Sequence, residues 1–504
     1  MKKTLLFLLL ALLLMGKTVN AGEITGTDKA KDFAPNILPQ LQVTKTNGKI
    51  IIDGNLDDIG WVGAARAINF TQAEPVDMVK PQVNTTAMIT YDDDNLYIAV
   101  IAFDEDPSSI RSSLRDRDKI FSDDIVGFQL DTYGDASWAY QIFANPNGIQ
   151  GDLRWTREDV DASFDIIYNS KGIITPTGYQ VEFSIPFASL RFPDRKIQEW
   201  KITFWRVRPR ENFEEYSWAA ISKNDPCLAC QFGSLSGIKD IVPGRSIEIL
   251  PSYNAIQSGF RDVDVANSKF QNSDATGEAS IGLRYGLSSN TSIEGTINPD
   301  FSQVESDVAQ IDVNNNFALF FPERRPFFQE GSDLFNSWYN IVHTRSINDP
   351  SVAAKLTSRT DKLSYAYLAA IDERSPILIP GEEESHIVRN AGKSYSNILR
   401  MRRSYGDNSH IGFFAVDRRF EGNGSGTNIS VDSNMRIRKL YNLKLQGVFS
   451  HTNEINDTLL TQGLNQQLFD KEGHTVGMDG ESFIGNALFA RFERNARNWD
   501  YRFS

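Results

Sequence analysis

The chain has 504 residues, which is too long for one domain and predicts two or three. The net charge is −13 and no basic patch or RNA-type aromatic motif stands out, which argues against a nucleic-acid partner. Hydrophobic residues make up 40% of the chain, and short alternating runs are separated by Gly, Asn, Asp and Ser. This pattern predicts an all-β protein with sizeable cores.

The N-terminus has the features of a secretory signal peptide over residues 1–21. Lys2 and Lys3 precede an apolar run at residues 4–15, and small residues ending at Ala21 match a cleavage site. The run is shorter than the roughly 20 apolar residues of a membrane-spanning helix. We therefore expect an exported protein, in which the segment up to residue 40 is a linker.

Residues 41–243 form the first predicted domain, an antiparallel β-sandwich. Two alternating runs, residues 83–91 and 96–103, flank a hairpin turn at Asp92-Asp93-Asp94-Asn95. Three successive aspartates could also bind calcium, but they lack the glycine and distal glutamate of a calcium loop. The one short helical turn that we expect covers residues 186–190.

The two cysteines, Cys227 and Cys230, form a Cys-Leu-Ala-Cys motif. A zinc site would need two more ligands, and the chain has five histidines and no other cysteine. A thioredoxin-like redox site belongs in a βαβ unit, which this pattern does not predict. In an exported protein we expect a small structural disulfide or two plain thiols. No metal site or cofactor is predicted.

Residues 246–504 are predicted to form an antiparallel β-barrel of the outer-membrane type, possibly incomplete. Strands become longer, as at residues 278–287, 428–438 and 441–450, and one face of each is apolar. Charges on the second face are costly in a dry core and natural in a water-filled lumen. The alternative is a large soluble sheet. Residues 411–418 alternate poorly.

A barrel must close, because an open edge leaves backbone groups unpaired in lipid. We expect about ten or eleven strands after residue 246, counted as alternating runs. This uncertain number leaves two interpretations, a small closed barrel and part of a longer one. We favour the longer barrel.

One ordered set of motifs resembles the family 9 carbohydrate-binding module, a β-sandwich found attached to xylanases and other surface proteins. The resemblance covers roughly residues 41–240 and implies a glycan partner. Its motifs are Ile52-Asp53-Gly54-Asn55-Leu56-Asp57-Asp58 with Trp61, then Ser122-Asp123-Asp124-Ile125-Val126, Asp131-Thr132, Tyr140, Phe143-Ala144-Asn145-Pro146-Asn147-Gly148 and Asp152.

A second set resembles an uncharacterised family of Gram-negative outer-membrane barrels that carry such a module at the N-terminus. Its motifs are Asn298-Pro299-Asp300-Phe301-Ser302-Gln303-Val304-Glu305, then Phe320-Phe321-Pro322-Glu323-Arg324-Arg325-Pro326-Phe327-Phe328 and Glu330-Gly331. Members are usually longer than this chain. The resemblance implies contact with outer-membrane lipid and a sandwich that is periplasmic or plugs the barrel.

Sugar binding needs flat aromatic faces and a few polar groups that contact hydroxyls. Trp138 and Trp155 lie at strand ends next to turns and are the candidate platforms, whereas we expect Trp61 in the core. Asp124 and Arg206 are candidate hydroxyl contacts, although Asp124 is equally explained as the start of a strand.

The segment at residues 320–328 is too rich in proline for a strand. Its charged residues, with Glu330, can pair with one another in a wet lumen: Glu323, Arg324, Arg325 and Glu330. One hypothesis is a loop folded into the barrel, where paired charges narrow a pore. The other is a loop packed structurally against the sandwich or the barrel wall.

Three functions follow from these features. The first is a non-catalytic outer-membrane protein that binds or passes carbohydrate during carbohydrate catabolism. The second is a glycoside hydrolase of the xylan-degrading type, but no carboxylate pair stands out and no Gly-x-Ser-x-Gly or His-Glu-x-x-His motif occurs. The third is a structural envelope protein that docks an unidentified protein partner.

Overall fold

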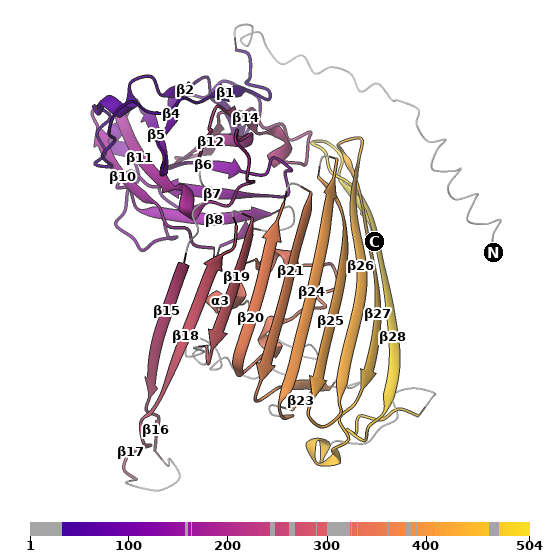
Figure 1. Ribbon diagram of the computed structural model, residues 1–504. Coiled ribbons are helices and arrows are strands. Elements are labelled where there is room, and N and C mark those ends of the chain that lie inside the picture. Colours follow the sequence, from indigo (N-terminus) through magenta and orange to yellow (C-terminus); the bar gives the residue numbers. More distant parts are fainter. Residues whose placement is uncertain are drawn as a thin grey trace, which may run out of the picture. The chain divides into compact units, whose positions relative to one another are not determined.

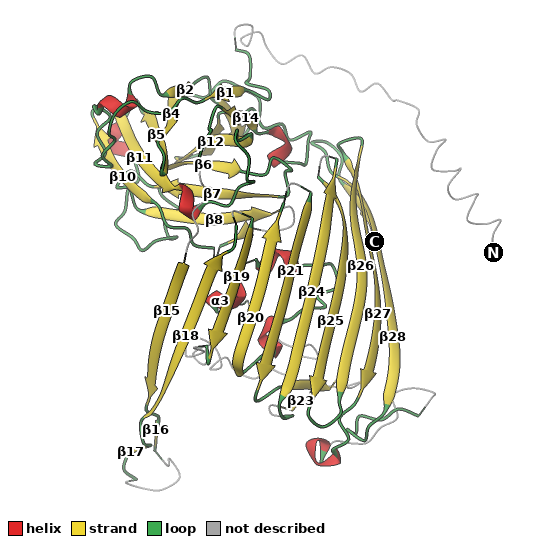
Figure 2. Ribbon diagram, viewed as in Figure 1, coloured by secondary structure: helices red, strands yellow, loops and turns green. Residues whose placement is uncertain are grey.

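The computed structural model describes residues 33–504 except 157–159, 163, 242–246, 262–267, 289, 300–322, 324, 330, 361, 380–385, 389–390, 407 and 463–472. Strands dominate, with a few short helices (Figure 2). The all-β prediction is therefore confirmed. No helix in the described part of the chain has the length and apolarity to cross a membrane.

Two sheets build the predicted sandwich (Figure 1). All their pairings are antiparallel except that of β1 with β14. The nine-stranded sheet has the order β1-β14-β12-β6-β7-β8-β9, with β13 joining β12 to β3. Its strands are β1 (Gln40–Gln42), β3 (Thr71–Glu74), β6 (Ile125–Asp131), β7 (Trp138–Ala144), β8 (Gln150–Thr156), β9 (Val160–Asp161), β12 (Trp200–Pro209), β13 (Phe213–Ser217) and β14 (Gly233–Ser236).

The five-stranded sheet has the order β10-β11-β5-β4-β2. Its strands are β2 (Ala65–Ala67), β4 (Thr85–Tyr91), β5 (Asn95–Phe103), β10 (Asn169–Thr175) and β11 (Gly178–Pro186). Alternate side chains of both sheets meet in one core, in which Phe128 of β6 contacts Phe183 of β11 edge to face. The hydrophobic half of each alternating run thus supplies the interior.

The predicted hairpin is confirmed, because β4 pairs antiparallel with β5. The Asp92 carboxylate closes the turn by accepting hydrogen bonds from the backbone N–H groups of Asp94 and Asn95. The predicted helical turn is the 3-10 helix Phe187–Ser189. The sandwich also has 3-10 turns at Ile59–Trp61, Pro107–Ser109 and Ala229–Gln231, which the sequence pattern did not predict.

Cys227 and Cys230 form a disulfide, one of the two states expected from the sequence. Cys227 is buried beside Ala139 and Phe232. The bond lies in an apolar cluster and therefore acts as a structural link.

After the sandwich, an antiparallel sheet runs through eleven strands in the order of the chain, with β15 and β29 at its ends (Figure 1). Strands β24 to β28 are 12 or 13 residues long. The members are β15 (Ile247–Ile256), β18 (Thr276–Gly286), β19 (Thr291–Ile297), β20 (Pro350–Arg359), β21 (Leu363–Asp372), β24 (Ser394–Tyr405), β25 (Ser409–Phe420), β26 (Ser425–Ile437), β27 (Tyr441–Asn453), β28 (Ser482–Arg494) and β29 (Tyr501–Phe503).

Two small hairpins lie in the connections between these strands. They pair β16 (Gly259–Phe260) with β17 (Gln271–Asn272), and β22 (Ile377–Ile379) with β23 (His386–Val388).

The two faces of the large sheet differ sharply. What we call its apolar face exposes large hydrophobic side chains, which include Ile281, Leu283, Ile293, Val352, Tyr367, Met401, Phe413, Val431, Phe449, Ile484 and Leu488. What we call its polar face carries buried polar and charged side chains, which include Ser292, Glu294, Thr296, Lys355, Thr357, Arg400, Asp432, Asn434, Gln446 and Glu493. This arrangement reverses that of a soluble sheet.

Two short helices, α3 (Pro326–Gln329) and α4 (Ser332–Phe335), pack against the polar face. Phe328 and Leu334 contact a small apolar area of the sheet that includes Leu368 and Phe414. Because this area is covered by helices, hydrophobic residues here occupy strand positions that carry polar residues elsewhere.

Candidate functional site

Trp138 does not face outward. It is 6% exposed and belongs to the sandwich core. Its ring lies 6.0 Å from the ring of Tyr133 and 4.7 Å from that of Tyr140, measured between centroids. The prediction of a solvent-facing platform at Trp138 is therefore wrong, because the ring packs with two tyrosines in the interior.

Trp155 is half-buried on β8, where it stands opposite Ala139 of β7 and Val160 of β9. It packs against the cluster that contains Phe232 and the disulfide. Part of the ring reaches the surface, so its role as a platform stays a prediction.

Asp124 and Arg206 are fully buried in a network of charges. The Asp124 carboxylate pairs with Arg210 at 2.7 Å, and Arg206 pairs with Asp104 at 3.2 Å. Arg208 also binds Asp104, and the guanidinium groups hold the pKa of Asp104 below its usual value against the opposing effect of burial. The prediction that these residues contact sugar hydroxyls is therefore wrong, because buried partners satisfy their charges.

The motif that begins at Ile52 has a structural role in the described sandwich. The Glu182 carboxylate accepts hydrogen bonds from the backbone N–H groups of Asp53 and Gly54, at 3.1 and 2.7 Å. Gly54 has a φ of 95°, a conformation that favours glycine. Trp61 lies in the core as expected and donates its indole N–H to the same carboxylate. Glu182 of β11 thus fixes the turn at Asp53 and Gly54 and also holds Trp61 of the following 3-10 helix.

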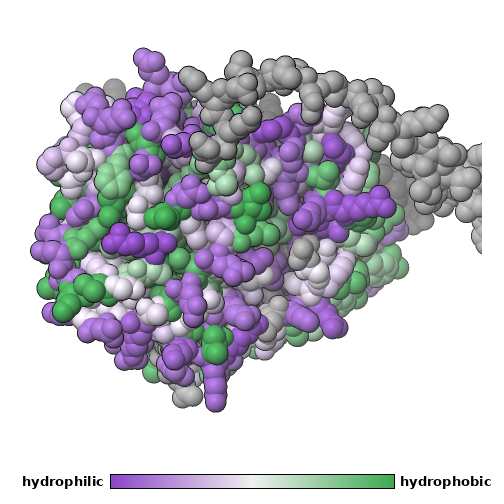
Figure 3. Space-filling model, turned by 90° about the horizontal axis from the view of Figure 1, so that it is seen from above, coloured by the Kyte–Doolittle hydropathy of each residue, from purple (hydrophilic) through white to green (hydrophobic). Residues whose placement is uncertain are grey.

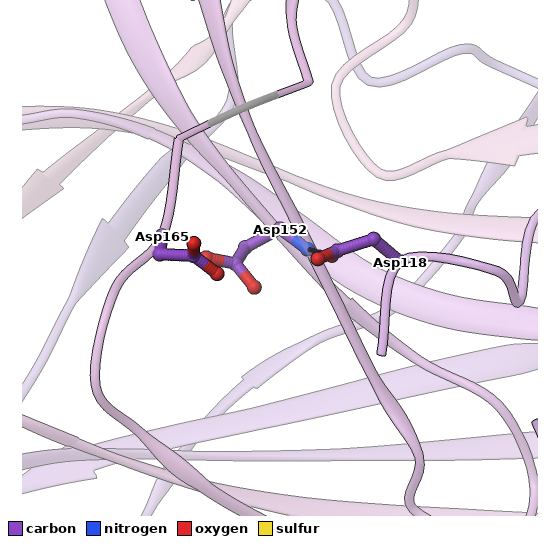
Figure 4. A group of neighbouring side chains, drawn as sticks. All are labelled: Asp118, Asp152 and Asp165. Atoms are coloured by element: carbon purple, nitrogen blue, oxygen red, sulfur yellow. Dashed lines mark hydrogen bonds between the residues drawn. The ribbon is translucent and has the colours of Figure 1, made fainter. Parts of the chain in front are cut away.

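Three aspartates, Asp118, Asp152 and Asp165, lie side by side on the sandwich (Figure 4). Arg117 compensates their charge, with its Nε 2.9 Å from Asp152 and 3.3 Å from Asp165. Burial nevertheless raises the pKa of Asp152 to about 6, with Arg117 opposing the shift. The group is an ion-paired cluster, in which Asp152 also accepts the N–H of Ile166.

The proline-rich segment packs against the polar face. Arg325 pairs with Glu323 at 2.6 Å, as predicted, and donates to the carbonyl groups of Thr344 and Ile347. Phe328, under the Arg325 guanidinium, belongs to the apolar contact with the sheet. This agrees with the interpretation of a structurally packed loop. Arg324 and Glu330 lie outside the described residues.

A cavity of about 80 Å³ lies on the polar face. The register of the strands determines which side chains form its floor. Arg402 of β24 stands opposite Gly412 of β25, which stands opposite Asp432 of β26. The row continues through Gln446 of β27 to Phe489 of β28. Residues directly opposite one another share a face, so this row crosses five strands on one side.

The next row, two residues along each strand, adds polar groups. It joins His410, Asn434, Lys444 and Arg491 across β25 to β28. Asn434 is 6% exposed, yet its Oδ1 accepts no hydrogen bond from any described residue. The floor therefore combines cations with a buried acceptor that has no partner.

Trp338, in the segment after α4, provides the aromatic surface of the cavity. Its ring stacks on Phe489, with 4.0 Å between centroids and 14° between planes. The Arg491 guanidinium carbon lies 3.8 Å from the ring centroid, and the N–H of Tyr339 donates to Gln446 Oε1. Trp338 is 40% exposed, so the indole is held in place and still open.

Two arginines of the cavity differ in their partners. Arg400 forms a buried pair with Asp432 and reaches it across Gly412, where a Cβ would collide with the guanidinium. Half-buried Arg402 makes no hydrogen bond or ion pair with any residue that the structure describes. Sequence reasoning missed this site. The available signal was an Asn-Ser-Trp-Tyr-Asn stretch between two strands of the large sheet.

Residues 262–367 match a family that is described as a domain of unknown function (DUF5916). No curated protein sequence matches the chain. A family 9 carbohydrate-binding module from Caldicellulosiruptor kristjanssonii, solved with cellotriose, matches 41% of this chain and 100% of its own, with 20% identity and a TM-score of 0.29. A structure described as a carbohydrate-binding protein of Bacteroides uniformis matches 39% of this chain and 98% of its own, with 15% identity and a TM-score of 0.31. Similarity at this level identifies no function.

Proposed function

We propose that the protein is exported to the outer membrane, where the large sheet forms a lipid-facing wall and its polar face lines an interior that binds or passes carbohydrate. One observation carries the membrane part, which is the reversed polarity of the sheet. Large hydrophobic side chains such as Leu283 and Val431 are exposed, while Lys355 and Glu294 form a buried ion pair at 3.0 Å.

Water is a poor environment for such a surface. Soluble monomers rarely expose contiguous apolar areas larger than a few hundred Å². The apolar face extends over strands of 12 or 13 residues, whereas roughly 9–11 tilted residues cross a bilayer. By contrast, the surface in Figure 3 mixes hydrophilic and hydrophobic residues, which is typical of protein that contacts water.

Two adjacent positions of β18 test the wall directly. Leu283 lies on the apolar face, and Gly282 lies on the polar face, where an added Cβ would make only ordinary van der Waals contacts. The native cysteines are bonded to each other, so Leu283→Cys or Gly282→Cys can be labelled alone with a fluorophore. In liposomes with quenchers on the lipid chains, we expect quenching at position 283 and little at position 282.

A water-soluble quencher should give the opposite result. Equal quenching at both positions by the lipid-borne quencher would contradict a lipid-facing wall. Failure of the folded chain to enter liposomes would contradict it as well.

We also propose that the sandwich binds glycan. The ordered motifs shared with family 9 modules support this proposal, and half-buried Trp155 is the candidate platform that still reaches the surface. Titration of the full chain with xylan and cellulose fragments should show saturable binding that Trp155→Ala weakens. Binding that is unchanged in this variant would exclude Trp155 as the platform.

A further inference from the structure

We propose that the cavity on the polar face binds an acidic saccharide unit, with its carboxylate on Arg402, a sugar C–H face on Trp338 and a hydroxyl on Asn434 Oδ1. This inference deepens the proposed function, because it rests on a polar face that lines a carbohydrate-accessible interior. It adds a substrate class and a site on the wall, which Ser137 and Thr156 of the sandwich also line.

Trp338 provides a flat aromatic surface, held in one position, on which the C–H face of a sugar ring can stack. Phe489 and Arg491 support the indole, and the Tyr339 N–H anchors the segment to β27 through Gln446. Little side-chain freedom remains to be lost when a ligand stacks on it, which favours affinity. A tryptophan that served only the core would be covered, whereas 40% of this residue is exposed.

Asn434 supplies the second observation. Buried polar atoms in folded proteins nearly always have a hydrogen-bond partner, and exceptions need an explanation. The Oδ1 of Asn434 has none in the described structure, and the residue lines the cavity. A hydroxyl group of a bound sugar would donate the missing hydrogen bond.

The positively charged side chains of the cavity favour an acidic ligand over a neutral one. Lys444 is paired with Glu493 at 3.5 Å, and Arg400 is paired with Asp432. Arg402 lines the same cavity and is attracted to Asp333, whose carboxylate is already paired with Arg359 at 2.6 Å and with Arg154 at 3.3 Å. Arg402 itself makes no ion pair with a described residue. The planar guanidinium matches a carboxylate through two parallel hydrogen bonds, so a uronic-acid-like unit satisfies it.

The cavity has room for ordered water. A single water needs roughly 10–15 Å³, and the cavity offers about 80 Å³. The hydroxyl groups of a sugar that enters it would replace the hydrogen bonds of several such waters.

The test uses the full chain, folded in detergent micelles, and two probes, trigalacturonate and neutral galactotriose. We expect the acidic probe to bind at least about tenfold more tightly, as measured by calorimetry. Arg402→Gln should remove this preference and leave the neutral probe unchanged. Trp338→Ala should weaken both probes. The matched controls Arg403→Gln, the neighbouring position on the opposite face, and Trp499→Ala should change neither.

Asn434→Asp is a second variant that preserves shape and should repel the acidic probe selectively. Thermal unfolding followed by circular dichroism confirms that each variant is folded. No binding to the folded wild-type chain, or acidic binding that survives both Arg402→Gln and Trp338→Ala, would overturn the inference. Neither result would contradict the proposal of a lipid-facing wall, because the liposome quenching experiment tests that proposal separately.

Discussion

The indole N–H of Trp61 donates a 2.9 Å hydrogen bond to Glu182, 121 positions away in the sequence. The other carboxylate oxygen binds the turn at Asp53 and Gly54, so one buried acid joins β11 to the start of the sandwich. This bond explains the tryptophan of the first motif as a structural anchor.

Trp61→Phe should therefore lower the free energy of unfolding of the sandwich by about 1–3 kcal/mol, because it leaves a buried carboxylate oxygen without its donor. Urea unfolding of the full chain, followed by far-UV circular dichroism, measures the change. Glu182→Gln should also destabilise the domain, because the amide nitrogen cannot accept from these N–H groups. A Trp61→Phe variant as stable as the wild type would contradict this account.

Asp152 should make the sandwich less stable as pH rises. Burial raises its pKa in the folded chain to about 6 from the ordinary 3.8. Between these values the folded chain holds a proton that the unfolded chain has lost, so stability falls as pH rises from about 4 to 6 and then levels off. The full effect is about 3 kcal/mol.

The comparison with Asp152→Asn isolates this group. The wild type should lose up to about 3 kcal/mol relative to the variant between pH 4 and pH 7, in urea unfolding at both values. A difference that does not depend on pH would mean that Arg117 keeps Asp152 ionised throughout.

Val431→Arg should destabilise the chain in lipid bilayers by about 2–4 kcal/mol if the position lies near the bilayer midplane. Val431 is exposed on the apolar face, so this cost arises from transfer of the charge into hydrocarbon. Folding titrations into liposomes provide the measurement, and Val431→Leu is the control that preserves apolarity. Equal stability of the two variants would argue against lipid at this position.

Glu294→Gln should cost up to about 3–5 kcal/mol, because it removes the carboxylate that lies 3.0 Å from the buried Lys355 ammonium. The two side chains lie on adjacent strands of the polar face and are almost fully buried. The double variant Glu294→Gln/Lys355→Met should recover much of this loss, as measured in the same folding titration. Additive losses would show that the two charges act independently.

Period-two alternation allowed the sequence to predict the strands around the 92–95 turn and β18, β26 and β27, because one face of each is mostly apolar. The same logic failed for β25, since Phe414 lies on the polar face beneath α4. Local patterning cannot show that a helix from a distant connection covers part of a polar surface.

The candidate sites were less predictable for a related reason. Whether Arg206 reaches solvent depends on Asp104, 102 positions earlier, and not on its own strand. Likewise, Trp338 becomes part of a site only once register places Phe489 beneath it. The alternation pattern predicts on which face of the sheet a side chain lies, but it does not predict which residue of another strand that side chain contacts.

Gly412 has a consequence for how the strands align. Arg400 and Asp432 belong to strands that do not hydrogen-bond with each other, and their ion pair passes over β25 where it has no side chain. A two-residue slip of β25 would place His410 or Phe414 beneath the pair and break it. The ion pair therefore forms only when β24, β25 and β26 are aligned as they are here, and it stabilises this register relative to slipped ones.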